Sequence, residues 1–231
     1  IMSSDWSSDV CSSDLDRYAE MSYNRAIEAV ESGRFEQEIA PVPIRDRKGN
    51  TTEFAVDENP KPTPFETLSK MKPAFRKDGK GTAGNASIIS DGASAVVVMS
   101  DTRAKELGLT PMARIGAQAS AGIDMKYVLV APILAIPKCL NKIGMTAKDM
   151  DLLEINEAFS GSTVAVIKEL GLDTDKVNVN GGSVSLGHPI GASGARVLTT
   201  LLYEMIRRDL QNGIASLCLG GGEAVAMTVH R

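Results

Sequence analysis

From Pro111 onward, segments with strand-like spacing of apolar residues alternate with segments of helical spacing. The clearest helix is SGARVLTTLLYEMIRRD, residues 193–209, whose apolar residues recur at i, i+3, i+4, i+7 and i+8. This apolar stripe consists of Leu198, Leu201, Leu202, Met205 and Ile206. Asn212 and Gly213 are expected to end the helix.

The neighbouring segments complete an alternating pattern. Helices are expected over 133–143 and over 162–170, the second ended by Gly171 because glycine readily adopts the left-handed conformation. Strands are expected over 112–120 and 152–156, and in a hairpin formed by 214–219 and 224–229 around a glycine turn. Such alternation is typical of layered α/β architecture.

The part before Pro111 is less regular. Residues 16–33 predict one helix, 38–46 a short strand, and 48–68 an exposed polar excursion rich in proline. The apolar run AVVVM, 95–99, predicts a buried strand, and a boundary is expected near 108–111.

The opening stretch IMSSDWSSDVCSSDL, residues 1–15, repeats Ser-Ser-Asp without helical or strand periodicity. It resembles translated sequencing-adapter text, so we expect a non-native leader and exclude it from the fold. Cys11 has no strand or glycine turn around it and is therefore not a candidate nucleophile.

Composition narrows the class of protein. A net charge of −4 argues against a nucleic-acid or anionic-membrane partner, and 43% hydrophobic residues fit a globular interior. The longest apolar run, 127–137, is broken by Pro132 and is too short to span a bilayer, which needs about 20 residues. The 3 cysteines form no metal-binding spacing, which suits a reducing compartment, and we expect a cytoplasmic protein.

Three polar residues follow or flank buried segments, where open α/β sheets bind ligands. Asn156 follows the strand LLEI, His188 lies in the glycine-rich turn GHPIGASG before the long helix, and Cys218 precedes the GGG turn. An amide, an imidazole and a thiol suit acyl transfer, in which a thiolate attacks a thioester and carbonyl charge is stabilised. Each also has a structural interpretation: Asn156 as a helix cap, Cys218 as a small buried hydrophobe, and His188 as a hydrogen-bonding group. His230 is expected to be solvated and without a role.

Four motifs resemble the thiolase family: GTAGNASIISDGASAVVVMS at 81–100, NEAF at 156–159, NVNGGSVSLGHPIGASGAR at 178–196 and CLGGGEA at 218–224. The resemblance implies a layered αβαβα fold, here truncated to a complete C-terminal half plus remnants of the loop domain and the N-terminal half. The implied divisions are a loop-domain remainder at 16–89, the last strand and helix of the N-terminal domain at 90–110, and the C-terminal domain at 111–231.

The resemblance also implies an activity: reversible exchange between a 3-ketoacyl-CoA plus CoA and two acyl-CoA molecules, through an acylated cysteine. His188 would activate the nucleophile and Cys218 would be the acid/base, while Asn156 and the backbone N–H of Gly220 would serve two oxyanion holes. Ser87 and Phe159 would contact the substrate, Ser87 along the pantetheine arm.

Coenzyme A enters as a substrate, with no cofactor and no metal. Homodimers or homotetramers are expected for the intact parent protein. The basic residues Arg76, Lys77 and Lys80 would either meet CoA phosphates or form a solvated charge run.

Two departures from the family pattern matter. CLGGGEA has Ala224 in place of a final glycine, and the part of a thiolase that carries the nucleophilic cysteine does not appear. We therefore expect this chain alone to be inactive and to expose an apolar face. The alternatives are a ketoacyl synthase-like condensing enzyme, disfavoured because only His188 occupies a turn, and a non-catalytic CoA-binding or subunit-docking fragment.

Overall fold

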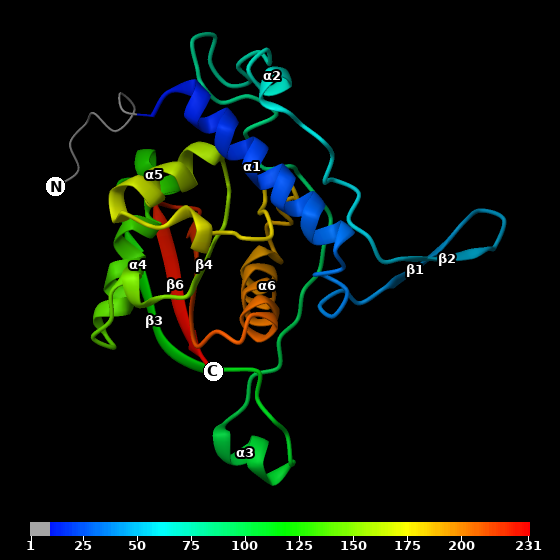
Figure 1. The fold of residues 1–231 in the computed structure, drawn as a ribbon, viewed down its shortest axis with the longest axis vertical. Helices are drawn as coiled ribbons and strands as arrows, with labels where there is room; N and C mark the ends of the chain where they lie inside the picture. The colour runs from blue at the N-terminus through cyan, green and yellow to red at the C-terminus, as the bar shows by residue number, and fades with distance from the viewer. Residues whose placement is uncertain (1–9) are drawn as a thin grey trace.

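The C-terminal half of the computed structural model, which describes residues 10–231, is built on a mixed four-stranded sheet of order β3-β6-β5-β4 (Figure 1). Strand β4 (Leu152–Ile155) runs parallel to β5 (Asn212–Leu219). Strands β5 and β6 (Glu223–His230) form an antiparallel hairpin, and β6 pairs with the edge strand β3 (Arg114–Gly122).

Helices cover the two faces of this sheet. Side chains of β5 alternate: Ile214 packs into one core with α4 (Pro132–Asn141) and α5 (Ser160–Leu170), whereas Ala215 packs against α6 (Ser193–Arg207). The result is three layers: α4 and α5, the sheet, and α6 (Figure 1). Residues 10–231 form no second large sheet.

The N-terminal part packs along the outside of these layers. Helix α1 (Ser12–Glu31) lies against α5, and a small core joins its Ala19 and Tyr23 to Leu68 of the short helix α2 (Phe65–Leu68). Strands β1 (Val42–Arg45) and β2 (Thr51–Phe54) form an exposed hairpin that extends away from the body to the right in Figure 1, and α3 (Asp101–Glu106) projects separately at the bottom of the same view. Short 3-10 helices connect the rest: η1 (Met125–Val130), η2 (Ala147–Asp149) and η3 (Thr174–Lys176).

Most of the expected elements are confirmed, including every strand and helix after Pro111. Gly171 ends α5 with φ +59°, the left-handed stop that its position predicted. The long helix ends at Arg207, however, with Asp209 at φ 51°, and Asn212 and Gly213 open β5 instead of ending the helix.

Two expectations for the N-terminal part are wrong. Residues 95–99 form no strand, and Val97 and Val98 are 86% and 66% exposed. An apolar run becomes a strand only beside a strand that accepts its hydrogen bonds, and none of the described strands lies next to this one. The excluded stretch 1–15 is also partly structured: 1–9 lie outside the described residues, but α1 begins at Ser12 and Leu15 is buried.

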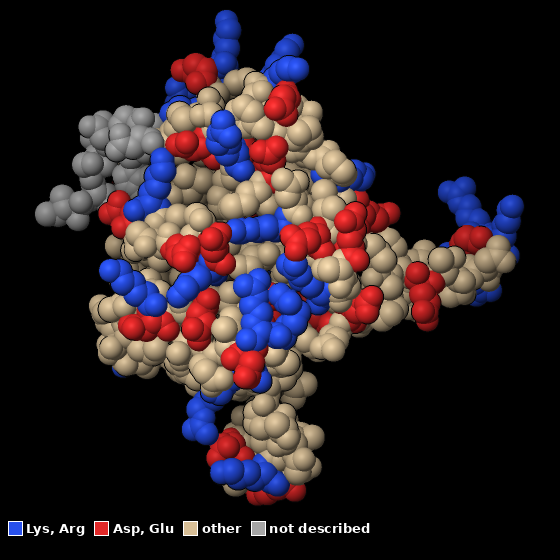
Figure 2. All heavy atoms as spheres, viewed as in Figure 1, with Lys and Arg blue, Asp and Glu red and all other residues tan. Residues whose placement is uncertain are grey.

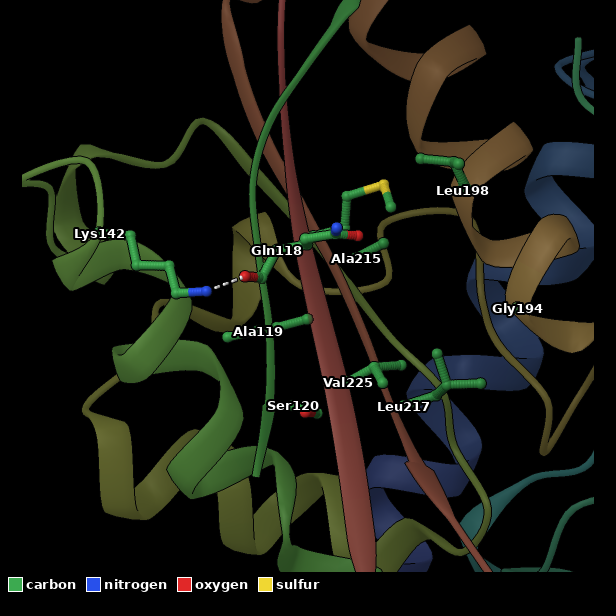
Figure 3. Close-up of a pocket in the computed structure, with 11 residues that line it drawn as sticks. Gln118, Ala119, Ser120, Lys142, Gly194, Leu198, Ala215, Leu217 and Val225 are labelled. Atoms are coloured by element: carbon green, nitrogen blue, oxygen red, sulfur yellow. Dashed lines mark hydrogen bonds between the residues drawn. The ribbon is translucent and has the colours of Figure 1, made fainter. Parts of the chain in front are cut away.

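A hollow of about 520 Å³ lies beside α6, where the helix leaves β3 and β6 uncovered (Figure 3). Its lining combines Leu198 of α6 with Leu217, Val225 and Met227 of the sheet and Gln118 of β3. Together with Val97 and Val98, this surface agrees with the expected apolar face.

Charge is mixed over the visible surface. On the face shown in Figure 2, acidic and basic side chains are interspersed and do not form a field of one sign. None of the helices among residues 10–231 combines the length and apolar character needed to cross a membrane. Within the same residues no cluster of three or more His, Cys, Asp and Glu side chains is arranged to hold a metal ion.

Candidate active site

The carboxyl end of β4 brings Asn156 to the edge of the sheet. Its backbone N–H donates to the carbonyl of Ser216 at 2.9 Å, so Asn156 extends the β4–β5 ladder by one position. Its side chain is only 4% exposed. The helix-cap interpretation is wrong, because α5 begins at Ser160 with Phe159 in the cap position.

His188 reaches the same place from the loop before α6. Its backbone N–H donates to the carbonyl of Ile88 at 2.8 Å, and its ring Nε2 lies 3.5 Å from Nδ2 of Asn156. The preceding Gly187 has φ +107°, and a Cβ there would lie 2.1 Å from Oγ of Ser90. Glycine is therefore required at 187 so that the backbone can turn the imidazole toward Asn156.

Cys218 lies near this edge on β5, two residues beyond Ser216, opposite Ala224 in the hairpin. Among residues 10–231 its Sγ forms no hydrogen bond with Asn156 or His188, so these three side chains share an edge of the sheet without forming a contiguous triad. Burial raises the pKa of the Cys218 thiol, which therefore stays protonated at neutral pH.

The remaining predicted residues surround this edge. Ser87 donates its backbone N–H to the carbonyl of Ala158 at 3.2 Å, and the neighbouring Ala86 pairs with Phe159. The Phe159 ring meets Phe75 edge-on, with centroids 5.5 Å apart. Gly220 is exposed in the hairpin turn.

The other residues weighed above lie elsewhere. Arg76 forms an exposed ion pair with Asp78, which suits the solvated-charge interpretation. His230 is only partly exposed and its Nδ1 bonds to Oδ1 of Asn212, so the expectation of a fully solvated side chain is wrong, while its lack of a role stays a prediction. Ala224 is fully buried in a regular hairpin register, so this replacement of glycine leaves the strand pairing intact.

Glu157, which no sequence pattern had singled out, is completely buried beside Asn156. Its Oε1 accepts hydrogen bonds from Tyr18 Oη (2.8 Å) and Asn178 Nδ2 (3.0 Å). Its Oε2 accepts from Ser22 Oγ (2.8 Å) and from the backbone N–H of Val184 (3.1 Å). Glu157 therefore connects α1 to the loop before α6, which contains Asn178 and Val184. The signal for it in the sequence was an acidic residue directly after an apolar strand.

A second buried group of charges lies behind His188. Burial raises the pKa of Glu154 to about 8 and that of Glu38 to about 7, although the charge of Arg196 acts on both in the opposite direction. The pKa of His188 is lowered by burial and further by Arg196. The imidazole is therefore neutral at physiological pH and available to accept a proton.

Comparisons with known proteins agree with this geometry. A family profile for "Thiolase, C-terminal domain" matches residues 109–231, and one for "Thiolase, N-terminal domain" matches residues 7–102. An acetyl-CoA acetyltransferase of Thiocystis violacea is 54% identical over 94% of this chain and 55% of its own length. The chain thus spans about half the length of the curated relatives it matches.

Solved structures give the same result. The acetyl-CoA acetyltransferase of Bacillus anthracis superposes with a TM-score of 0.94 at 47% identity, over 97% of this chain and 57% of that one. Human mitochondrial 3-ketoacyl-CoA thiolase, solved in complex with CoA, gives 0.92 at 39% identity, over 98% and 56%. Shared fold, sequence and motif order lead to one conclusion: this chain belongs to the thiolase family.

Proposed function

We propose that Asn156, His188 and Cys218 form part of an acyltransferase site that performs reversible thiolytic cleavage of 3-ketoacyl-CoA, together with a nucleophilic cysteine from a thiolase N-terminal part. The observation that carries this proposal is the 3.5 Å approach of His188 Nε2 to Asn156 Nδ2 at the sheet edge, with Cys218 on the adjoining strand. The relatives' names point to acetyl-CoA as one acyl donor.

The geometry suggests a division of labour. His188 has its Nε2 facing Asn156, where it can accept a proton from an attacking thiol or donate one to a thioester oxygen. Asn156 presents an N–H donor at the same point, suited to a water or an oxyanion. Cys218, held as a thiol, would give its proton to the departing carbanion in cleavage and become a thiolate. In condensation that thiolate would take a proton from the acetyl carbon and return to the thiol.

CoA is the proposed partner and serves as a substrate, with no additional cofactor. The intact enzyme is proposed to be a cytoplasmic homodimer or homotetramer. The exposed side chains of Val97 and Val98 and the apolar lining of the hollow beside α6 support an assembled form, because monomers rarely leave much apolar surface open.

A chimera tests the catalytic proposal. The N-terminal part of the Thiocystis violacea acetyl-CoA acetyltransferase, fused to residues 10–231, is expected to cleave acetoacetyl-CoA with CoA, whereas this chain alone is expected to show no turnover. In the chimera Cys218→Ala should suppress cleavage of acetoacetyl-CoA, but incubation with acetyl-CoA should still give an acetylated nucleophile detectable by mass spectrometry, because acyl exchange from acetyl-CoA releases CoA thiol and needs no proton transfer to or from carbon.

The control is Cys139→Ala, which removes a buried thiol of α4 outside the site. Loss of acylation in Cys218→Ala, with its circular dichroism spectrum unchanged, would contradict the role assigned to Cys218. Robust cleavage by the unfused chain would contradict the need for a separate nucleophile.

A further inference from the structure

A series of hydrogen bonds runs from Arg196 of α6 into the candidate site, and in each of them the donor lies nearer to Arg196 along the series. Nη2 of Arg196 donates to Ser183 Oγ at 3.4 Å, and Ser183 Oγ donates to Asn156 Oδ1 at 2.6 Å. A guanidinium group can only donate, so the hydroxyl of Ser183 accepts from it and directs its own single proton to Asn156. The amide oxygen of Asn156 must then face Ser183, which leaves the amide nitrogen facing His188.

The second half of the series continues through the imidazole. Because Nδ2 of Asn156 is a donor, the facing Nε2 of His188 accepts and carries no proton. On the other side of the ring, Nδ1 lies 2.6 Å from Ser193 Oγ, and Ser193 donates to the carbonyl of Pro189 at 3.1 Å. A hydroxyl has one proton, so Ser193 accepts from Nδ1–H. The series therefore begins at a group with only donors and ends at a carbonyl, which only accepts.

We propose that Arg196 and Ser183 are positioning residues that set the tautomer of His188, leaving Nε2 unprotonated where the reacting atoms would lie. The catalytic meaning of this assignment rests on the function proposed above. Neither residue needs to touch the substrate, since each acts through Asn156. The tautomer matters because only an unprotonated Nε2 can take a proton from a thiol on that side of the ring.

The surroundings of Arg196 explain why it is held in place. Its Nε and Nη1 atoms are buried without a hydrogen-bond partner, and Nη1 lies 3.9 Å from Oε2 of the buried Glu154. Burial raises the pKa values of Glu38 and Asp57, and both carboxyl groups lie close enough to this guanidinium for its charge to offset part of that rise. Three carboxyl groups therefore surround this guanidinium, and its direct hydrogen bond among these atoms leads to Ser183.

The test is the ¹⁵N spectrum of the imidazoles in this chain, recorded at about pH 9, where the histidines are neutral. The sequence has only 2 histidines, and a His230→Asn variant assigns the signals. The unchanged chain is expected to show His188 with Nδ1 protonated and Nε2 bare. In Ser183→Ala the Asn156 amide loses its fixed orientation, and the Nε2–H tautomer, which a free histidine side chain prefers, should become the major form. Arg196→Met should produce the same change.

A matched control separates this effect from general loosening of the loop. Ser185 is fully buried in the same loop but bonds to Ser22 and Gly182, so Ser185→Ala should leave the tautomer unchanged. The titration midpoint of His188 separates the effect of the Arg196 charge from that of hydrogen-bond direction. It should rise in Arg196→Met, which removes a nearby positive charge, and stay in place in Ser183→Ala.

The proposal fails if Ser183→Ala retains a bare Nε2, or if the unchanged chain already has Nε2 protonated. If Arg196→Met does not fold, as judged by circular dichroism, Ser183→Ala decides the question alone. None of these measurements requires turnover. An inactive chimera with the expected tautomer would therefore refute the proposed function and leave the positioning roles standing.

Discussion

Replacing Glu157 with glutamine should destabilise the fold strongly, although the two side chains are nearly the same size. Both carboxyl oxygens of Glu157 act as acceptors, each for two donors: Tyr18 and Asn178 on Oε1, and Ser22 and the Val184 N–H on Oε2. Glutamine offers one acceptor oxygen and one NH₂ group, so whichever way the amide turns, two buried donors face another donor.

The magnitude follows from that count. Each hydrogen bond to a charged acceptor contributes about 1.5–3 kcal/mol, so losing two should lower the free energy of unfolding by about 3–6 kcal/mol. With an m-value of about 3 kcal/mol/M, the urea midpoint should fall by about 1–2 M. Tyr18→Phe removes one of the four donors and leaves Glu157 hydrogen-bonded to the other three, so it should lower the free energy of unfolding by about 1 kcal/mol.

Urea unfolding followed by far-ultraviolet circular dichroism measures these differences on the chain itself. The matched control is Glu169→Gln on the exposed side of α5, expected to lie within about 0.5 kcal/mol of the unchanged chain. A Glu157→Gln variant as stable as this control would show that the four donors find other acceptors, and the assigned role of Glu157 in joining α1 to the site would be wrong.

Two further predictions concern pH and the hairpin turn. Because the folded-state pKa values of Glu38 (about 7) and Glu154 (about 8) lie above the ordinary value of 4.5, the folded chain binds protons more tightly there, and the free energy of unfolding should fall as pH rises from about 5 to 8. Urea titrations across that range should show a shallower slope for Glu38→Gln, and an equal slope would refute the assignment. In the turn, Gly221 and Gly222 have φ of +89° and +90°, but only a Cβ at Gly222 would collide with the backbone, 2.3 Å from the carbonyl oxygen of Ile123. Thermal unfolding should therefore show a cost of about 1 kcal/mol for Gly221→Ala and clearly more for Gly222→Ala, and equal costs would contradict the close approach.

The elements after Pro111 could be predicted because their own residues decide them. The apolar stripe of α6 and the left-handed stop at Gly171 are local features that need no distant partner. The run at 95–99 shows the limit of this reasoning. Its apolar content is as strong as that of β5, but strand formation depends on a neighbouring strand that no local pattern reveals.

Some residues of the candidate site could likewise be predicted from the sequence, and others could not. Asn156, His188 and Cys218 stand out in the sequence because each adjoins a strand end or a glycine turn. Arg196 and Ser183 do not, because their part depends on the direction of hydrogen bonds between residues 13 and 27 positions apart. Such directions come from tertiary placement, which residue spacing alone does not encode.

The contacts of Glu157 also constrain the order in which the chain can fold. Tyr18 and Glu157 are 139 positions apart, and the Ser22 hydroxyl that shares this carboxylate also meets Ser185, 163 positions away. During synthesis α1 therefore emerges long before its polar partners exist, whereas its contact with Leu68 of α2 can form earlier. Docking of α1 onto the C-terminal half is therefore a late step in folding, because the groups that bind Tyr18 and Ser22 are translated much later.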